Sequence, residues 1–318
     1  MIDFSGFLRS GLVPIGLVCH LGLAVVASPA LGQSDSDPWL EQPVTDDAFT
    51  GYLEFFAYDS DLPLEIATLA RSESQGIEIE RIRYVSTPGV EAYAEYFRAA
   101  RSDPRSRPHV VLVHGGLQSG KTSMRPTAEL LVRSGVNVLA IDLLHFGERD
   151  TGLLTTFTED DKHQNLYNRP PLYLSWVVQT VKDVGRAIDL LVSHYRADPE
   201  GIGYVGFSRG AQVGFIVAGA EPRFNAVALM YGGHLDRFET GHLAAACPAN
   251  YAGRIAPTPL WVLNGSFDSD YDREKSVEPI HRLLQEPVQI RWVDTGHQYP
   301  EESDLSDLAG WLRDRIGR

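Results

Sequence analysis

The sequence predicts an α/β fold, in which a mostly parallel, twisted β-sheet has helices on both faces and an antiparallel N-terminal edge. In the second part of the chain, short, wholly apolar segments alternate with longer amphipathic segments, as expected for parallel strands covered by helices. Before them, alternating polar and apolar residues indicate half-buried antiparallel strands. The composition, with 43% hydrophobic and 22% charged residues among 318, is that of one large globular domain.

The N-terminal residues 1–32 have the features of a cleavable signal peptide. Residues 11–27 are nearly uncharged and follow Arg9, and the small residue Gly32 precedes a polar run that starts at Gln33. The apolar run is too short and interrupted to favour a membrane-spanning helix. We therefore expect an exported protein, periplasmic or secreted, without stable membrane association after cleavage. An uncleaved N-terminal anchor is the alternative.

The start of the mature chain is expected to be irregular. Residues 33–48 are rich in Asp, Ser and Pro and predict a flexible lead. The folded domain is expected over 49–318, and it begins with three β-like segments, over 52–58, 77–85 and 90–97.

The rest of the domain alternates strands with helices. The apolar segments expected as strands are 110–113, 136–141, 202–207, 226–230, 260–263 and 288–293. The segments expected as helices are 122–132, 174–194, 211–220, 271–284 and 305–315. Two further stretches, 148–171 and 232–257, are long for loops, and insertions of this length often form lids or substrate walls.

Charge and cysteine content exclude several classes of function. The chain has 28 Lys plus Arg against 42 Asp plus Glu, a formal net charge of -14. Because such a surface repels phosphates, we expect no nucleic-acid partner.

Cys19 and Cys247 are too few for a disulfide framework or a cysteine-based zinc site, and no histidine pair has zinc-site spacing with a carboxylate. We therefore expect no cofactor or metal, and we expect Cys247 to be a buried small hydrophobe. The oligomeric state does not follow from the sequence.

Ser208 stands in a Gly-x-Ser-x-Gly pattern between an expected strand and an expected helix. Serine is a weak nucleophile unless it is held near a base and near groups that stabilise an anion. A tight strand-to-helix turn exposes the hydroxyl at a helix N-terminus, and it needs small residues such as Gly206 and Gly210 on either side. The pattern predicts a nucleophile; a glycine-flanked serine that caps the helix is the alternative.

The residues after the strand 110–113 predict an oxyanion hole. His114 and two glycines end this strand, and glycines there let the backbone aim N–H groups at the serine. The expected donors are the N–H of Arg209 and that of either Gly116 or Leu117, a choice that the sequence leaves open. His114 is expected to bond to backbone groups in the turn below.

An acid and a base are expected beyond the ends of two later strands. Asp268 follows the strand 260–263, and His297 follows the strand 288–293. Parallel sheets collect their functional groups at the carboxyl ends of the strands. The chain order Ser208, Asp268, His297 is one of the orders known for a nucleophile, acid and base.

Neighbouring residues offer alternatives for both roles. Asp270 and Asp272 lie in the same acidic loop as Asp268, and Asp294 is expected to cap a strand end or form a turn. Among the other histidines, His281 is expected on a helix surface. Loop or insertion positions, which could line a pocket or bind nothing, are occupied by His145, His163, His234 and His242.

Several of these motifs occur together in one known family. They are the His114-Gly115-Gly116 strand end, the turn 206–210, Gly265-x-x-Asp268, Gly296-His297, and Asp142 followed by Phe146-Gly147-Glu148-Arg149. From about Val90 to the C-terminus the sequence resembles the α/β-hydrolase family, and within it the serine esterases similar to dienelactone hydrolases and acetyl xylan esterases. The resemblance implies a catalytic domain with Ser208 as nucleophile, His297 as general base and acid, and Asp268 holding the tautomer of the imidazole. Dienelactone hydrolases carry cysteine where this chain has Ser208.

The predicted function is hydrolysis of a small-molecule carboxylic ester through an acyl-enzyme. A serine peptidase on the same fold is an alternative, although no separate domain is visible that would restrict access to peptides. A non-catalytic binding protein is another alternative, although such relatives typically lose a triad member and this chain has all three. The aromatic, partly basic insertion 148–171 could form the wall of an acyl or sugar site, or a packed lid.

A third alternative is nucleotide hydrolysis. Residues 115–122 match the Gly-x-x-x-x-Gly-Lys-Thr pattern of a phosphate-binding loop, between a strand and a helix, and Asp142 resembles the Mg²⁺-binding acid of such enzymes. Three observations argue against it. Exported proteins generally meet no ATP, antiparallel strands precede the loop, and the nucleophile, acid and base would be left unexplained. Lys121 and Thr122 are therefore expected on the surface near the active-site mouth.

Overall fold

The computed structural model describes residues 37–235 and 241–317. The predicted signal peptide and the first four residues of the predicted lead lie outside the described residues. The described residues belong to one compact unit, Ser36–Arg318. Of the helices in these two ranges, none combines the length and hydropathy needed to cross a membrane.

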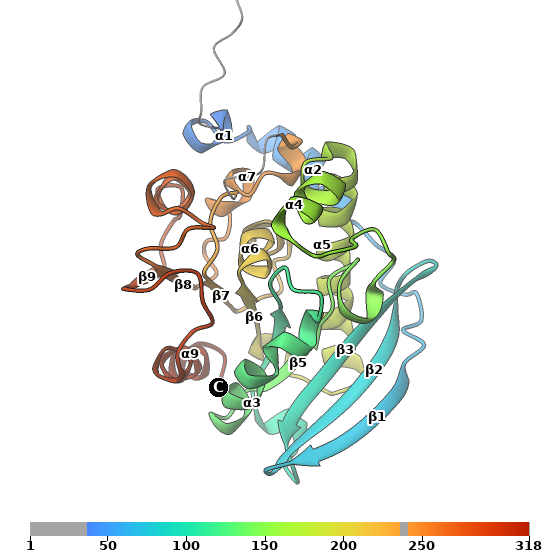
Figure 1. The fold of residues 1–318 in the computed structure, drawn as a ribbon. Coiled ribbons are helices and arrows are strands. Elements are labelled where there is room, and N and C mark those ends of the chain that lie inside the picture. Colours follow the sequence, from blue (N-terminus) through green and yellow to red (C-terminus); the bar gives the residue numbers. More distant parts are fainter. Residues whose placement is uncertain (1–36, 236–240, 318) are drawn as a thin grey trace, which may run out of the picture. The chain divides into compact units, whose positions relative to one another are not determined.

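A mixed β-sheet forms the centre of the described part of the chain (Figure 1). Its strands are β1 (Ala67–Ser74), β2 (Ile77–Thr87), β3 (Val90–Ala99), β4 (His109–Val113), β5 (Asn137–Ile141), β6 (Ile202–Phe207), β7 (Ala226–Met230), β8 (Leu260–Gly265) and β9 (Val288–Val293). Their order across the sheet is β1-β2-β3-β5-β4-β6-β7-β8-β9. The pairs β1–β2, β2–β3 and β3–β5 are antiparallel, whereas β4 to β9 run parallel. The predicted fold class is therefore confirmed.

Helices cover both faces of this sheet (Figure 1). In the described ranges the α-helices are α1 (Pro38–Glu41), α2 (Asp46–Phe56), α3 (Arg125–Arg133), α4 (Glu159–Lys162), α5 (Pro170–Ser193), α6 (Arg209–Ala220), α7 (Ala249–Ala252), α8 (Glu278–His281) and α9 (Glu302–Ile316). Short turns adjoin three of these helices: the 3-10 turn η2 (Gly120–Met124) leads into α3, the π-helical turn η4 (His163–Tyr167) follows α4, and the π-helical turn η7 (Arg273–Val277) leads into α8. The 3-10 turn η6 (Ala244–Ala246) lies shortly before α7. Helices α5 and α6 pack on one face, and α3 and α9 pack on the other.

The wholly apolar strands follow from this two-sided burial. Successive side chains of a strand point to opposite faces of the sheet. In β4, Val111 and Val113 belong to the core under α5 and α6, whereas Val110 and Leu112 belong to the core under α3 and α9. All four are completely buried, so the strand has no solvent-facing position that would take a polar residue.

The predicted strand over 52–58 is wrong, because residues 46–56 form helix α2. Thr45 caps this helix by accepting a hydrogen bond from the N–H of Ala48. Phe49, Leu53 and Phe56 recur at helical spacing and pack on the core. Helix α1 and the first residues of α2 also lie where the sequence predicted a flexible lead up to residue 48.

The edge strand β1 was not predicted. Seven of its eight residues are exposed, so it has no apolar alternation from which a strand could be inferred. It pairs with β2 through its backbone, and this pairing depends on the neighbouring strand rather than on its own side chains.

Candidate active site

Ser208 lies in the tight turn between β6 and α6, at the carboxyl edge of the parallel strands. Its φ of 52° and ψ of -116° form a backbone conformation that residues other than glycine rarely adopt. A hydrogen bond of 2.8 Å from the N–H of Ser208 to the carbonyl of Met230 ties the turn to β7. The strained turn presents the hydroxyl beyond the strand end, where a substrate can reach it.

The glycines two positions before and after Ser208 are required by space. A Cβ on Gly206 would lie 2.4 Å from the carbonyl oxygen of Gly210. A Cβ on Gly210 would lie 2.4 Å from the carbonyl oxygen of Val113 in β4. Both neighbours are backbone atoms, so the Gly-x-Ser-x-Gly pattern follows from the close approach of β4, β6 and α6.

A line of hydrogen bonds joins Ser208, His297 and Asp268. Ser208 Oγ lies 2.9 Å from His297 Nε2, and His297 Nδ1 lies 2.8 Å from Asp268 Oδ2. The other carboxylate oxygen of Asp268 accepts the backbone N–H groups of Asp270 and Tyr271, each at 2.9 Å. With the proton on Nδ1 donated to Asp268, Nε2 is free to accept the serine proton.

The loops after β8 and β9 hold Asp268 and His297 together. The N–H of Phe267 donates to the carbonyl of Thr295 at 2.9 Å, one hydrogen bond of a short bridge between the two loops. A Cβ on Gly265 would lie 2.5 Å from that same carbonyl oxygen. The Gly265-x-x-Asp268 pattern is therefore explained by the contact that brings Asp268 to His297.

The three other carboxylates near the site do not take the position of Asp268 at His297 Nδ1. Asp270 Oδ2 lies 3.9 Å from His297 Nε2, on the side of the ring that faces Ser208, and its side chain is 38% exposed. Asp272 caps η7 by accepting the N–H groups of its first turn. Asp294 lies 3.3 Å from the hydroxyl of Ser266.

Both ring nitrogens of His114 lie at hydrogen-bond distance from backbone groups, as predicted. Its Nδ1 lies 2.5 Å from the carbonyl oxygen of Gly115, and its Nε2 accepts the N–H of Leu143 at 3.0 Å. Burial lowers the pKa of His114, so the ring stays neutral. It fixes the turn after β4 against the loop after β5.

A small pocket opens beside the serine. It is lined by Gly116, Glu159, Lys162, Tyr167, Ser208, Arg209, Asp270 and Tyr271. Gly116 and Arg209, two of the predicted oxyanion donors, are therefore together at Ser208. Leu117, the alternative donor, is not among these residues, and its side chain is 49% exposed.

The insertion 148–171 supplies one wall of this pocket, through Glu159, Lys162 and Tyr167. Lys162 Nζ donates to the carbonyl of Gly116 at 3.0 Å and pairs with Glu159. The guanidinium of Arg209 lies 3.9 Å from the ring centre of Tyr167. Composition left open whether this insertion forms a wall or a packed lid, and the contact between Lys162 and Gly116, 46 residues apart, has no local signal in the sequence.

Two sequence expectations are corrected. Lys121 is not a surface residue: its side chain is 1% exposed and its ammonium binds Asp142 and Glu148. His281 is not on an open surface but half-buried against Trp292, and burial lowers its pKa to about 4.

A second hollow, of about 340 Å³, lies at the opposite edge of the sheet. It is lined by residues that precede β6, β7 and β8, among them Asp198, Asn225 and Pro259. Sites of parallel sheets form beyond the carboxyl ends of the strands. This hollow lies at the amino ends, away from Ser208.

Solved structures with the same fold support the α/β-hydrolase architecture. An acetyl xylan esterase from Paenibacillus sp. R4 aligns with a TM-score of 0.68 and 18% identity, over 86% of this chain and 96% of that one. A cold-adapted esterase from an Arctic intertidal metagenomic library aligns with 0.61 and 17%, over 78% and 98%. A putative dienelactone hydrolase from Klebsiella pneumoniae subsp. pneumoniae MGH 78578 aligns with 0.57 and 15%, over 76% and 99%. A search of the curated proteins found no match.

The fold and the serine-centred site therefore define an α/β hydrolase. Residues 97–295, more than half of the chain, match the model of the Dienelactone hydrolase family. The chain belongs to the dienelactone hydrolase family and is a carboxylic ester hydrolase.

Proposed function

We propose that the chain hydrolyses a small-molecule ester through an acyl-enzyme on Ser208, with His297 as general base and acid and Asp268 as the residue that orients the imidazole. The observation that carries this proposal is the unbroken line of hydrogen bonds from Ser208 Oγ through both ring nitrogens of His297 to the buried carboxylate of Asp268.

In the proposed acylation, Ser208 Oγ attacks the ester carbonyl while its proton passes to His297 Nε2. Asp268 stabilises the imidazolium that forms. The tetrahedral intermediate then collapses, the bond to the alcohol breaks, and the Nε2 proton leaves with the alkoxide. A water molecule then attacks the acyl-enzyme while Nε2 takes one of its protons. The acid is released when Nε2 passes this proton to Ser208 Oγ.

We assign the oxyanion to backbone N–H groups of Arg209 and Gly116. Arg209 is the first residue of α6, so its N–H lies at the positive end of a helix. Gly116 lines the same pocket as Ser208, which favours it over Leu117. The bond from Lys162 Nζ to the carbonyl of Gly116 supports the position of this backbone segment.

The substrate is proposed to carry a short acyl group. The free volume beside Ser208 is about 20 Å³, which is room for one water molecule. A longer acyl chain would have to displace Lys162, Tyr167 or Tyr271. We therefore expect acetyl esters to be cleaved with a higher kcat/KM than octanoyl esters of the same alcohol.

The decisive experiment combines a fluorophosphonate probe with mass spectrometry. We expect a single adduct on Ser208 that is absent in Ser208→Ala and retained in Ser266→Ala, a serine of the neighbouring β8 loop. Labelling that persists in Ser208→Ala would refute the assignment. Unlabelled protein that hydrolyses ATP with Mg²⁺ would move the function to residues 115–122, whereas inactivity towards both would favour a binding protein.

We also propose that the protein is exported and cleaved after Gly32, on the sequence of residues 1–32 alone. Mass spectrometry of protein from the periplasm or medium of an expressing bacterium should give an N-terminus near Gln33. Deletion of residues 11–27 should keep the protein in the cytoplasm. Full-length chain that starts at Met1 and stays in the cytoplasm would contradict export.

A further inference from the structure

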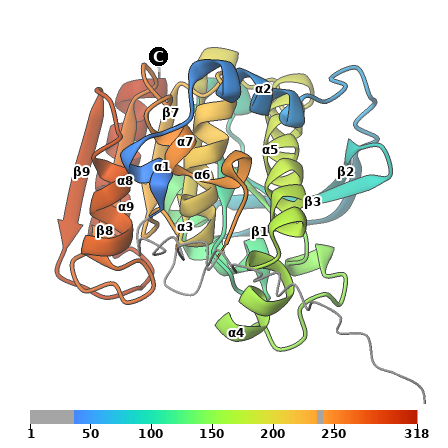
Figure 2. The ribbon, with the colours of Figure 1, turned by 90° about the horizontal axis from the view of Figure 1, so that it is seen from above.

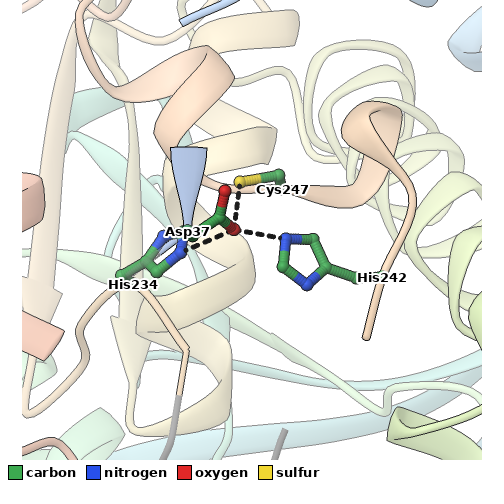
Figure 3. Close-up of side chains that lie close together, drawn as sticks. All are labelled: Asp37, His234, His242 and Cys247. Atoms are coloured by element: carbon green, nitrogen blue, oxygen red, sulfur yellow. Dashed lines mark hydrogen bonds and ion pairs between the residues drawn. The ribbon is translucent and has the colours of Figure 1, made fainter. Parts of the chain in front are cut away.

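Four side chains of kinds that bind transition metals meet in a cluster (Figure 3), and none of them lines the pocket at Ser208. They are Asp37, His234, His242 and Cys247, and one candidate ligand atom from each lies within 4.8 Å of all the others. Asp37 precedes α1, His234 follows β7, and His242 and Cys247 flank η6. Three separate segments of the chain therefore contribute to one cluster.

The distances are close to those of a tetrahedral site. Asp37 Oδ2 lies 3.1 Å from His234 Nε2, 2.6 Å from His242 Nε2 and 3.5 Å from Cys247 Sγ. In a tetrahedral zinc site, bonds of about 2.0–2.3 Å place neighbouring ligand atoms roughly 3.3–3.6 Å apart. Side-chain movements of about an ångström would thus bring all four atoms around one ion.

Burial and charge also fit a divalent cation. The side chains of His234 and Asp37 are 5% and 9% exposed, that of His242 is 10% exposed, and Cys247 is fully buried. A carboxylate and a thiolate would together neutralise the two positive charges of the ion, while both imidazoles bind as neutral ligands. Such a site would bury no net charge.

The cluster is incompletely satisfied by hydrogen bonds. His242 Nε2 lies close to Asp37 Oδ2, yet within the described residues it makes no hydrogen bond of acceptable geometry. A buried ring nitrogen without a hydrogen bond costs free energy. A metal ion would replace the contact of this nitrogen with the Asp37 carboxylate, 2.6 Å away, by a bond directed along its lone pair.

We propose that Asp37, His234, His242 and Cys247 bind a Zn²⁺ ion as a closed, four-coordinate structural site. Thiolate together with imidazole favours zinc over Mg²⁺ or Ca²⁺, which prefer oxygen ligands throughout. Four protein ligands leave no open position for water or substrate, so the ion is structural rather than catalytic. The sequence predicted no metal because Asp37 and Cys247 are 210 residues apart and the spacing matches no zinc motif.

The ion would fasten the segment before α1 to the insertion 232–257. Helix α1 lies beside α7 (Figure 2), and the Trp39 ring packs edge-on against His242 with centres 5.3 Å apart. The carbonyl of His234 accepts a hydrogen bond from Gln212 Nε2, in the helix that begins after Ser208. The proposed site thus lies against the first turn of the helix that begins after Ser208.

The test is the metal content of protein purified without a polyhistidine tag from zinc-supplemented medium. Elemental mass spectrometry should find about one zinc per chain. Cys247→Ser and Asp37→Asn should each weaken Zn²⁺ binding at least tenfold, measured by competition with a chelator. Two matched controls should bind as the wild type does: His281→Gln, a half-buried histidine elsewhere, and Asp46→Asn, an acid of the same segment that pairs with Arg254.

Two results on zinc content would overturn the proposal. One is wild-type protein that purifies without metal and takes up no Zn²⁺ in titration; the carboxylate of Asp37 would then be only a hydrogen-bond acceptor. The other is zinc that both ligand variants retain, which would place the metal elsewhere. If Cys247→Ser does not fold, Asp37→Asn decides, since Asn preserves the cap of α1.

A second test uses the wild type with Co²⁺ in place of Zn²⁺. The cobalt-loaded protein must show a thiolate charge-transfer band, and the absence of this band would exclude Cys247 as a ligand.

Discussion

The ammonium group of Lys121 lies 2.5 Å from Asp142 Oδ2, and the two side chains are 1% and 0% exposed. Lys121 Nζ also lies 2.6 Å from Glu148 Oε1, and its backbone N–H donates to Asp142 Oδ1 at 2.8 Å. The lysine and the acid that resemble nucleotide-binding groups in the sequence therefore bind each other. They join the loops after β4 and β5.

This ion pair predicts a large loss of stability in Lys121→Met. The variant leaves the carboxylate of Asp142 buried without its cation, and breaking a buried pair in this way costs about 3–5 kcal/mol. Urea denaturation would measure it. The control Arg105→Met removes an exposed pair with Asp103 and should change little. Equal effects of the two substitutions would contradict the structural role of Lys121.

Asp268→Asn should lower kcat by about a thousand- to ten-thousandfold, because an amide in this place favours the wrong tautomer of His297. The same exchange at Asp270 or Asp272 should cost far less, since neither carboxylate lies at Nδ1. Steady-state kinetics with an acetyl ester compares the three variants. A larger loss in Asp270→Asn than in Asp268→Asn would reassign the acid.

Two glycine substitutions should have opposite effects on stability. The Cβ of Gly206→Ala would meet backbone at 2.4 Å, so the free energy of unfolding should fall by about 1–3 kcal/mol or more. Gly310→Ala, in the interior of α9, meets nothing within 4 Å and should raise it by about 0.5–1 kcal/mol. Thermal and urea unfolding measure both. Tolerance of Gly206→Ala would show that the turn at Ser208 is less confined than the geometry indicates.

Acid should destabilise the protein in part through His109. Burial lowers the pKa of this histidine to about 4, against about 6.5 when unfolded. Between these values the unfolded chain binds the extra proton, so stability falls as the pH is lowered, by about 2 kcal/mol from pH 7 to pH 5. In His109→Gln this part of the slope should disappear from urea unfolding curves. An unchanged slope would mean that His109 does not contribute.

The sequence was sufficient where the determining residues form a pattern along the chain. The glycines that the turn at Ser208 requires stand within two positions of it, although Gly210 makes room for the distant strand β4, and the wholly apolar strands report directly that both faces of the sheet are covered. It failed at β1 and at 52–58. The first has no buried side chain, and the second has apolar residues at helical rather than alternating spacing.

Within the site, the order of Ser208, Asp268 and His297 along the chain was enough to predict which residue types meet at the carboxyl edge of the sheet. The choice of Asp268 over Asp270 follows from geometry, because the bridge between the β8 and β9 loops sets which carboxylate reaches Nδ1. Whether Lys121 is free or buried, and whether Asp37 meets Cys247 across 210 residues, depends on packing between distant segments. Such contacts leave no pattern along the chain, because their energy arises only when the fold brings the partners together and excludes water from them.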